Sequence, residues 1–326
     1  MNQAGRPKIV VLDAYALNPG DLSWDALHKL GVVDIYDRTP ENLILARAGD
    51  AEAVFTNKTP LSADALRALK ALRYVGVLAT GYNVVDLKAA NKLGITVTNI
   101  PIYGTASVAQ FVFALLLELC HHVGMHSDLV HAGEWCASPD WTFRRFPLVE
   151  LAGKTLGVIG FGRIGRQVAQ IAQAMKMELI VTGRVVPDGT DHPGIRYGSI
   201  EDVLAASDVV SLHCPLLPDT AGMIDAKRLS LMKKSAFLIN TSRGPLVVEQ
   251  DLADALNQDR LAGAAVDVLS VEPPIRTNPL LSAKNCIVTP HIAWATQEAR
   301  SRLLTTAIEN LAFFLNGEAR NVVSSI

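Results

Sequence analysis

The hexapeptide Gly160–Gly165, which reads GFGRIG, constrains the fold of this chain more than any other segment. It directly follows the strand-like run Thr155–Ile159, and it precedes a helical run that reaches Ala174. A G-x-G-x-x-G sequence in this context is typical of a dinucleotide-binding βαβ unit. The first glycine permits the turn, the second lets a pyrophosphate approach the backbone, and the third lets the helix pack on the strand. A purely structural glycine turn is the alternative, but both flanks favour a phosphate at the helix N-terminus.

Short β-branched runs alternate with helical segments on both sides of this loop. The first series has strand candidates at Lys8–Leu12, Ala53–Phe55, Tyr74–Val77 and Ile95–Thr98, and the second continues from Thr155 through ELIVT, DVVSL, AFLIN, AAVDV and CIVTP. Such alternation indicates parallel sheets covered by helices. The predicted fold class is therefore α/β, with two Rossmann-like or flavodoxin-like parallel-sheet domains, since single cores stop growing at roughly 250–300 residues.

The domain boundaries follow from the order of these elements. A long helix is expected from Ser107 to His122, and the final helix, Glu298–Leu315, is expected to return to the first unit. We predict a substrate-binding domain formed by residues 1–103 and 292–326 and a dinucleotide-binding domain formed by residues 104–291. Residues 131–147 are rich in Trp and Arg with little periodicity, so they are expected to form a loop or an extension.

The end of the second strand of the dinucleotide unit bears on the choice of cofactor. The fingerprint expects an acidic residue roughly 20 positions after the glycine loop, where it would accept from the adenosine 2′-hydroxyl. Here the strand Glu178–Thr182 ends in Gly183 and Arg184. Glycine leaves room for a 2′-phosphate and arginine can bind it, so NADP(H) is favoured over NAD(H). Alternatively, Arg184 is a solvated loop charge.

Three later segments carry candidates for acid–base chemistry. Arg243 follows the run AFLIN, Glu272 lies after AAVDV, and His291 follows CIVTP. All three fall near the carboxyl ends of predicted parallel strands, where open α/β sheets bind their ligands. An arginine can hold a carboxylate or carbonyl, a histidine can transfer a proton near neutral pH, and a carboxylate can orient that histidine. Each could be a structural polar group, and their joint placement after the glycine loop favours catalysis.

Several motifs in the same order resemble the D-2-hydroxyacid dehydrogenase family, most of all its glycerate dehydrogenase/hydroxypyruvate reductase branch. The matching segments span nearly the whole chain and are Thr56–Thr59, Ala79–Asn83, Ser107–Gln110, Leu151–Thr155, Gly160–Gly165, His213–Leu216, Asn240–Gly244, Asp267–Pro273 and Pro290–Trp294. The resemblance implies an active site in the cleft between two α/β domains, a homodimer, and reduction of a small 2-oxoacid such as hydroxypyruvate or glyoxylate to a D-2-hydroxy acid. The stretch Trp141–Phe146 departs from the glycerate branch, so the preferred 2-oxoacid stays open.

The resemblance also implies roles for individual residues. Arg243 would bind the 2-oxoacid, His291 would be the general acid/base and Glu272 would support it. Lys58 and the backbone amides of Thr80 and Gly81 would hold the substrate carboxylate. The implied cofactor contacts, with Asp267 at the nicotinamide carboxamide, are Val108, Gly160, Gly162, Arg163, Ile164, Gly165, Gly183, Arg184, His213, Cys214, Pro215, Thr220, Thr241 and Asp267.

Composition excludes several other classes. The net charge of −2 gives no reason to expect nucleic acid or an anionic membrane as partner. The four cysteines are scattered without a Cys-x-x-Cys pair, which argues against a disulfide framework or a zinc site and suits a cytoplasmic protein. No metal is expected, because His121, His122 and His126 lack an acidic partner pattern and are interpreted as structural or surface residues.

Two other functions stay open at this point. One is a dinucleotide-sensing binding protein with little turnover, which the fold alone would allow. The other is oxidation of a different acid, such as formate or phosphite, on the same scaffold. Retention of Arg243, Glu272 and His291 favours the hydroxyacid dehydrogenase over both.

Overall fold

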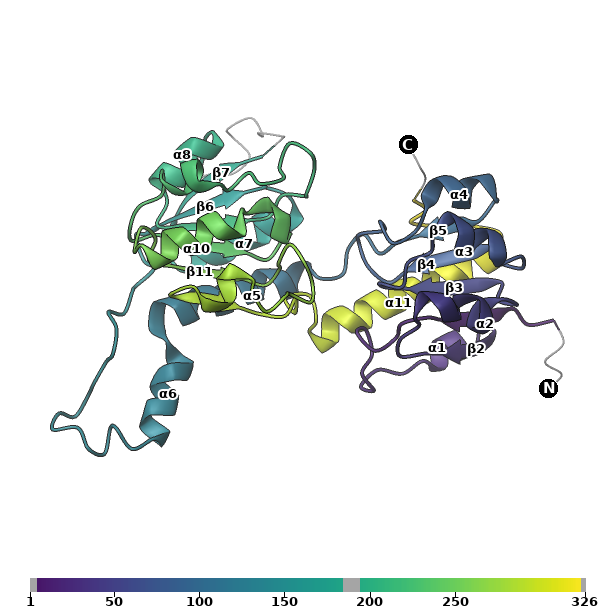
Figure 1. Ribbon diagram of the computed structural model, residues 1–326, viewed down its shortest axis with the longest axis horizontal. Coiled ribbons are helices and arrows are strands. Elements are labelled where there is room, and N and C mark those ends of the chain that lie inside the picture. Colours follow the sequence, from purple (N-terminus) through teal and green to yellow (C-terminus); the bar gives the residue numbers. More distant parts are fainter. Residues whose placement is uncertain (1–4, 184–193, 324–326) are drawn as a thin grey trace. The chain divides into compact units, whose positions relative to one another are not determined.

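The computed structural model describes residues 5–183 and 194–323, and these divide into two compact units. Unit 1 comprises Met1–Gly104 and Ala295–Ile326, and unit 2 comprises Thr105–Trp294 (Figure 1). Each unit is a parallel sheet with helices on both faces, as the alternating sequence predicts. The second unit is therefore inserted in the chain of the first.

The strands of unit 1 follow the order β2-β1-β3-β4-β5, all parallel. They are β1 (Lys8–Val11), β2 (Val32–Ile35), β3 (Ala53–Thr56), β4 (Tyr74–Val77) and β5 (Thr96–Thr98). The helices are α1 (Asp25–His28), α2 (Ile44–Ala48) preceded by the 3₁₀ turn Glu41–Leu43, α3 (Ala63–Ala68), α4 (Leu87–Lys92) and α11 (Gln297–Leu315). This strand order is that of flavodoxin-like folds, in which the chain reverses direction across the sheet between β1 and β3.

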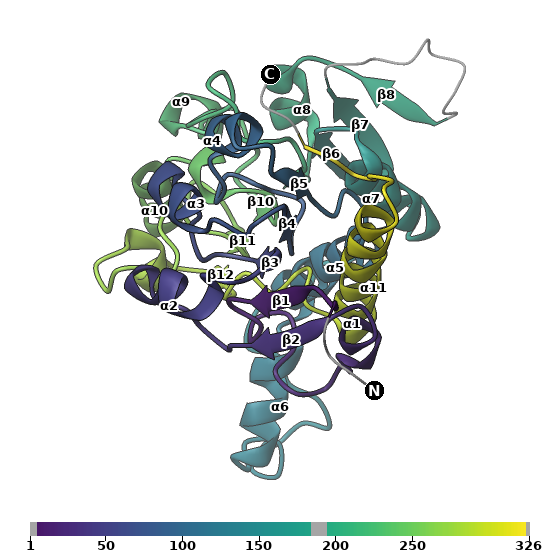
Figure 2. The same ribbon diagram turned by 90° about the vertical axis from the view of Figure 1, so that its right-hand side faces the viewer.

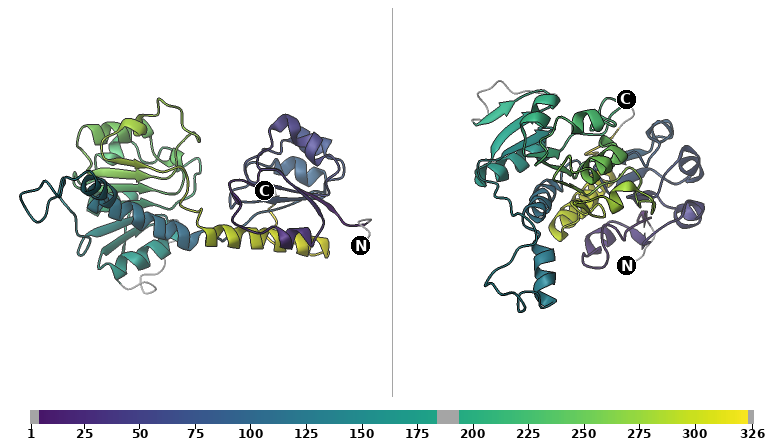
Figure 3. Two further views of the ribbon diagram at one scale, coloured as in Figure 1. Left: turned by 90° about the horizontal axis from the view of Figure 1, so that it is seen from below. Right: turned by 60° about the vertical axis from the view of Figure 1, so that its left-hand side comes forward.

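The two faces of this sheet are covered by different helices (Figure 2). Alternate strand residues such as Val54 and Val75 pack with α2, α3 and α4. The opposite face meets α11, where the rings of Tyr74 and Phe314 lie 5.0 Å apart. Figure 3 shows α11 lying along that face of the unit. Because both faces are buried, the central strands β3 and β4 are nearly continuous apolar runs.

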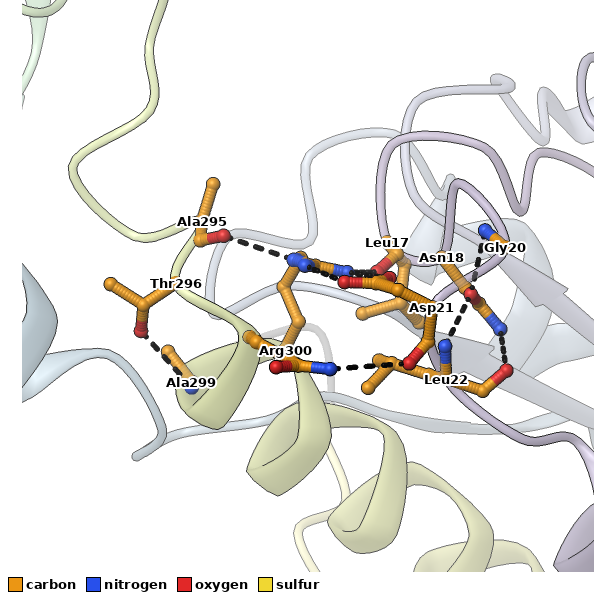
Figure 4. A network of polar contacts seen from close by, with 10 residues as sticks. Leu17, Asn18, Gly20, Asp21, Leu22, Ala295, Thr296, Ala299 and Arg300 are labelled. Atoms are coloured by element: carbon orange, nitrogen blue, oxygen red, sulfur yellow. Dashed lines mark hydrogen bonds and ion pairs between the residues drawn. The ribbon is translucent and has the colours of Figure 1, made fainter.

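The start of α11 is fixed by a buried arginine (Figure 4). Arg300 is 8% exposed. Its guanidinium donates to both carboxylate oxygens of Asp21, at 2.7 and 2.6 Å, and to the carbonyls of Leu17 and Ala295, each at 2.9 Å. Thr296 caps the helix through its side chain, which accepts from the N–H of Ala299. The first turn of α11 is thereby tied to the loop before α1.

Unit 2 has the strand order β12-β11-β10-β9-β6-β7-β8, again all parallel. Its strands are β6 (Thr155–Ile159), β7 (Glu178–Thr182), β8 (Ile195–Tyr197), β9 (Val209–Leu212), β10 (Phe237–Asn240), β11 (Gly263–Val266) and β12 (Cys286–Val288). The helices are α5 (Thr105–His121), α6 (Val123–His131), α7 (Arg163–Ala174), α8 (Ile200–Ala206), α9 (Ala226–Leu229) and α10 (Glu249–Asn257), with 3₁₀ turns at Gly244–Leu246 and Pro279–Ser282. The order is that of a Rossmann fold, whose topological switch point lies between β6 and β9.

Successive residues of the unit 2 strands enter different cores, as the two-residue period of a strand requires. Leu179 and Val181 of β7 belong to the core that also contains residues of α5 and α7, whereas Ile180 belongs to the core that contains residues of α8 and α10. No single helix among the described residues is long and apolar enough to cross a membrane; α5 and α6 meet the length and composition criteria only as a pair that is bent by 55°.

The long helix expected from Ser107 to His122 is present as α5, and a second helix follows it after a bend. Helix α5 ends at His121, His122 takes a left-handed backbone conformation with φ 47°, and α6 begins at Val123. Helix α6 projects from the sheet of unit 2 together with the irregular segment after it (Figures 1 and 2). No residue of α6 is buried. The expectation of an extension holds for residues 131–147, but α6 was not predicted.

Candidate active site

The glycine loop lies at the switch point of the unit 2 sheet, directly after β6. Gly160 has φ +102°, and a Cβ placed on it would lie 2.5 Å from the backbone nitrogen of Cys214. A Cβ on Gly165 would lie 2.3 Å from the carbonyl oxygen of Gly160. Both positions therefore require glycine, the first for the turn and the second for the approach of α7 to the strand.

The N-terminus of α7 is arranged to receive an anion. Gly162 is its N-cap, no side chain of the described residues caps the helix there, and the space around a Cβ on Gly162 is open. The first N–H groups of a helix have no partner within the helix, and the helix dipole favours negative charge beside them. Arg163 and Ile164 form the first turn. This end of α7 therefore fits a phosphate group.

A second observation on the same sheet edge also fits a bound dinucleotide. Thr241, directly after β10, is 8% exposed, and its hydroxyl oxygen has no hydrogen-bond partner among the described residues. Buried polar atoms are almost always paired, so an unpaired hydroxyl indicates a missing ligand or solvent. Both observations lie on the edge where the carboxyl ends of the strands meet, and they fit a nicotinamide dinucleotide cofactor.

The adenosine end of the predicted site is only partly described. Gly183 follows β7, and a Cβ on it would lie 3.3 Å from the backbone nitrogen of Phe161 in the glycine loop. This close approach gives Gly183 a packing role beside the proposed role in admitting a 2′-phosphate. Arg184 lies outside the described residues.

The segment after β9 contacts the glycine loop from the other side of the switch point. Nε2 of His213 lies 2.8 Å from Oγ of Ser211, and burial lowers the pKa of His213 to about 4. The imidazole is therefore neutral near pH 7. The carbonyl of Cys214 accepts a 2.6 Å hydrogen bond from Oγ of Ser242, which joins this segment to the loop after β10. Burial raises the pKa of the Cys214 thiol, which does not favour a nucleophilic thiolate.

Three other predicted cofactor contacts have ordinary structural surroundings. Thr220 accepts from the N–H of Leu217 at 2.8 Å and donates to the carbonyl of Pro215 at 2.8 Å, so its hydroxyl orders the turn. Pro215 is exposed in that turn, and Val108 is buried in α5. These three residues could therefore contact a cofactor through their backbone and apolar atoms.

The backbone of Arg243 is held at the sheet edge by the side chain of Asn240. Nδ2 of Asn240 donates to the carbonyl of Arg243 at 2.9 Å, and Oδ1 of Asn240 accepts from the N–H of Ser242 at 3.0 Å. The following Gly244 packs so closely that a Cβ on it would lie 2.0 Å from the carbonyl carbon of Leu269. The guanidinium is exposed and bonds only the carbonyl of Ser242 among the described residues, at 2.7 Å. Its remaining N–H groups are therefore available to an anionic ligand.

His291 and Glu272 form a hydrogen-bonded pair. Nδ1 of His291 lies 2.6 Å from Oε2 of Glu272, and Oε1 of Glu272 accepts from the N–H of Leu269 at 3.0 Å. An ionised carboxylate can only accept, so Nδ1 carries a proton and donates it to this bond. Nε2 is left for proton exchange with a substrate. About a third of each side chain is exposed, at 32% and 33%.

The backbone of His291 has an unusual conformation, with φ 55°. Its N–H donates to the carbonyl of Asp267 at 2.8 Å. The carboxylate of Asp267 accepts from the hydroxyl of Thr289 at 2.7 Å and from the N–H groups of Ile292 and Ala293, each at 2.8 Å. These bonds hold the turn that presents the imidazole. Although they favour the anion, burial dominates and raises the pKa of Asp267.

Asp267 therefore has a structural task that its sequence context does not reveal. Its carboxylate offers about four acceptor positions, of which three are filled. One position on Oδ2 remains for the predicted nicotinamide carboxamide. A further residue that sequence reasoning left without a role is Ser107, whose Oγ donates to the carbonyl of Ala293 at 2.6 Å. Its only signal was membership of the matched segment Ser107–Gln110.

The predicted substrate-binding residues of unit 1 also lie at the carboxyl edge of their sheet. Lys58 follows β3, its side chain is exposed, and its ammonium has no ion-pair partner among the described residues. Thr80 and Gly81 follow β4, and their N–H groups make no hydrogen bond with the described residues. Asn99 and the carbonyl of Ile100 hold Thr80 in place, at 2.7 and 2.8 Å. These free donors fit a small carboxylate.

The histidines near the break between α5 and α6 have local partners. Nδ1 of His126 lies 2.8 Å from the carbonyl of His122, and Nε2 accepts from the N–H of Arg145 at 3.3 Å. In the described part of the chain, no three His, Cys, Asp or Glu side chains are grouped to hold a metal ion.

Comparison with known proteins agrees with this geometry. The family model described as the NAD binding domain of D-isomer specific 2-hydroxyacid dehydrogenases matches residues 113–293. A hydroxypyruvate reductase of Blautia hydrogenotrophica is 51% identical over 97% of this chain and 99% of its own length. A glycerate dehydrogenase of Methylorubrum extorquens is 39% identical over 98% and 99%.

The chain is also similar to a solved structure that contains a nicotinamide dinucleotide. An acyclic imino acid reductase in complex with NADPH and D-Arg superposes with a TM-score of 0.81 at 31% identity. The match covers 97% of this chain and 99% of the reductase.

Proposed function

This chain belongs to the D-isomer specific 2-hydroxyacid dehydrogenase family, and we propose that its substrates are small 2-oxoacids of the hydroxypyruvate and glyoxylate type, with NADP(H) as its preferred cofactor. The protein is an oxidoreductase that uses a nicotinamide dinucleotide to reduce 2-oxoacids to D-2-hydroxy acids. The observation that carries the proposed chemistry is the 2.6 Å contact between His291 and Glu272 at the sheet edge that also holds the glycine loop.

The roles of the unit 2 residues follow from their donors and acceptors. Glu272 holds the imidazole through Nδ1, so Nε2 of protonated His291 donates the proton to the substrate oxygen. The free N–H groups of Arg243 bind the same region of the substrate and stabilise negative charge where it develops. When bound, a reduced nicotinamide supplies hydride to the carbonyl carbon. The glycine loop and Thr241 would hold that cofactor.

The roles of the unit 1 residues follow from the charge of the substrate. A 2-oxoacid is an anion, and the ammonium of Lys58 with the unpaired N–H groups of Thr80 and Gly81 offers charge-assisted hydrogen bonds to its carboxylate. We therefore assign substrate binding to unit 1 and dinucleotide binding to unit 2. The exposed donors are backbone groups and one lysine, which suits a short substrate.

The preference for NADP(H) rests on the ribose position. Gly183 brings no acidic side chain to the end of β7, and Arg184 follows it in the sequence. The packing of Gly183 against Phe161 is the competing explanation for the glycine. Arg184→Ala separates them: it weakens NADPH binding far more than NADH binding if Arg184 meets a 2′-phosphate. Equal effects on the two cofactors would leave packing against Phe161 as the explanation for Gly183.

We also propose that two copies of the chain associate through α6 and the segment after it. This region exposes large apolar side chains, namely Val123, Val130, Trp135, Trp141, Phe146 and Leu148. An isolated short helix with no buried face is marginally stable in water, so α6 needs a surface to pack on. A second copy supplies that surface symmetrically, as in most homo-oligomers. Sedimentation of Trp141→Ser against wild type tests this, because the proposal requires the substitution to weaken the dimer.

The direct test of function is oxidation of reduced nicotinamide with hydroxypyruvate, glyoxylate and pyruvate, each with NADPH and with NADH. Rapid oxidation that is faster with NADPH supports the substrate class and the cofactor together. Cofactor binding without turnover across the panel would instead support a dinucleotide-sensing protein. The free groups on Arg243 and His291 make that alternative the weaker one.

A further inference from the structure

The carboxyl edge of the unit 1 sheet holds a buried carboxylate to which the sequence motifs give no role. Asp13 follows β1, the strand beside β3 at the switch point of this sheet, and it is 9% exposed. A buried carboxylate needs several hydrogen bonds to offset its lost hydration. Its partners therefore define what Asp13 does.

All of its described partners are consecutive backbone N–H groups of one loop. Oδ1 accepts from the N–H of Asn57 at 2.7 Å, and Oδ2 accepts from the N–H groups of Lys58 and, at 2.7 Å, Thr59. The loop follows β3 and belongs to the predicted substrate-binding motif Thr56–Thr59. Three charge-assisted bonds to consecutive residues fix the backbone of this loop.

The rest of the loop is held by its neighbours. Oγ1 of Thr56 donates to the carbonyl of Thr59 at 2.7 Å, and Nδ2 of Asn57 donates to the carbonyl of Leu78 at 2.6 Å. Leu78 directly precedes the segment that holds Thr80. Asn57 and Thr59 are buried, whereas the side chain between them, Lys58, is exposed. The buried contacts thus set where the one exposed cation of the loop stands relative to the Thr80 and Gly81 amides.

We propose that Asp13 is a positioning residue for substrate binding, which fixes Lys58 and couples it to the neighbouring amides by clamping the Asn57–Thr59 backbone. This inference rests on the proposed function, in which Lys58 binds the substrate carboxylate. Asp13 touches no substrate: it acts through the loop. Three N–H donors offset the negative charge of its carboxylate, so Asp13 does not repel the incoming anion.

The test is a double-mutant cycle with Asp13→Asn and Lys58→Met in the full-length enzyme, measured with hydroxypyruvate at saturating NADPH. The asparagine keeps the shape but turns one acceptor into a donor that faces N–H groups. Each single substitution is expected to raise KM about tenfold or more, since a hydrogen bond to a charged group is lost or displaced. The double substitution should raise KM little beyond the larger single effect, because Asp13 acts through Lys58. The dissociation constant of NADPH should stay unchanged.

Each outcome decides between the assignments. If the two effects on KM multiply, Asp13 acts independently of Lys58 and the inference is wrong while the proposed function stands. If Lys58→Met leaves KM unchanged in an active enzyme, the proposed substrate site fails and the inference falls with it. The matched control is Asp64→Asn, which removes a carboxylate that is 92% exposed on the same unit. It should change neither the KM for hydroxypyruvate nor the dissociation constant of NADPH.

A second variant covers the case in which Asp13→Asn does not fold, as circular dichroism would reveal. Thr56→Val removes the hydroxyl that holds the Thr59 carbonyl and loosens the same loop without touching Asp13. It should raise KM, with the same lack of additivity toward Lys58→Met. Additive effects here would overturn the idea that the loop backbone positions Lys58.

Discussion

Oγ of Ser107, in the first turn of α5, donates a 2.6 Å hydrogen bond to the carbonyl of Ala293, two residues after His291. The N–H of Ala293 donates to Oδ2 of Asp267, so both backbone polar groups of Ala293 are held. The turn that presents His291 is therefore fastened to α5 as well as to the end of β11. Two elements far from each other in the sequence set the position of one imidazole.

Ser107→Ala is expected to lower kcat about tenfold, because the buried Ala293 carbonyl loses a partner whose absence is worth roughly 1–3 kcal/mol and the His291 turn loosens. Steady-state kinetics and fluorescence titration with NADPH check this, since cofactor affinity should be retained. Ser107→Thr keeps the hydroxyl and is the control. Unaltered kcat in Ser107→Ala would mean that Asp267 alone positions the turn.

His291→Asn is expected to reduce turnover by about 10²–10⁴-fold, the usual contribution of a general acid. Asparagine tolerates the left-handed backbone that this position requires, so the fold and NADPH binding should survive. Glu272→Gln keeps the shape of the Nδ1 partner without its charge and should lower kcat less than His291→Asn. Turnover near the wild-type rate in His291→Asn would refute the acid–base assignment.

Asp21→Asn is expected to lower the thermal midpoint, because Arg300 keeps its charge in a buried position without a carboxylate. The hydrogen bonds from Arg300 hold the pKa of Asp21 below its ordinary value. A lowered folded-state pKa stabilises the protein above the unfolded pKa near 3.8, and that stabilisation is lost as the pH falls through the folded value. Thermal melts of wild type and variant at pH 7 and near pH 3 should therefore differ less at the lower pH. An equal difference at both would exclude this ion pair as the cause.

His213 should make unfolding easier in mildly acidic solution. Burial lowers its pKa from 6.5 to about 4. Between those values the unfolded chain binds a proton that the folded chain does not, so stability falls as the pH drops from 6.5 toward 4, by up to about 3 kcal/mol. Urea unfolding at pH 7 and at pH 5 should show that His213→Gln loses less unfolding free energy between the two pH values than wild type does. Identical losses would place the acid sensitivity elsewhere.

The central strands and the edge strands β5 and β12 could be predicted from the sequence, whereas the edge strands β2 and β8 could not. The apolar runs in β1, β6 and β10 mark central strands, whose side chains are almost all buried. Strands β2 and β8 lie at sheet edges, are only partly buried, and are short runs interrupted by Asp34 and Arg196, so the sequence did not distinguish them from loops.

The active-site side chains and the support of His291 by Glu272 could be proposed from the sequence, but the other contacts that hold these side chains could not. Arg243, Glu272 and His291 stand after predicted strands, where parallel sheets gather ligands. The clamp from Asp13 joins residues 44 to 46 positions apart, and the bond from Ser107 to Ala293 spans 186 positions. Such pairings depend on which loops meet at a sheet edge, which strand order decides and local sequence does not. The end of α5 near His122 was predicted, but helix α6 directly after it was not.

The insertion of unit 2 within unit 1 sets an order for folding during protein synthesis. Residues 105–294 leave the ribosome as one continuous stretch, so unit 2 can complete both of its cores while translation continues. Unit 1 begins first, but the face of its sheet around Tyr74 stays uncovered until Phe314 of α11 has been made. The first part of the chain to be translated is thus the last to be finished, and a nascent chain stalled before α11 would expose that apolar face to chaperones.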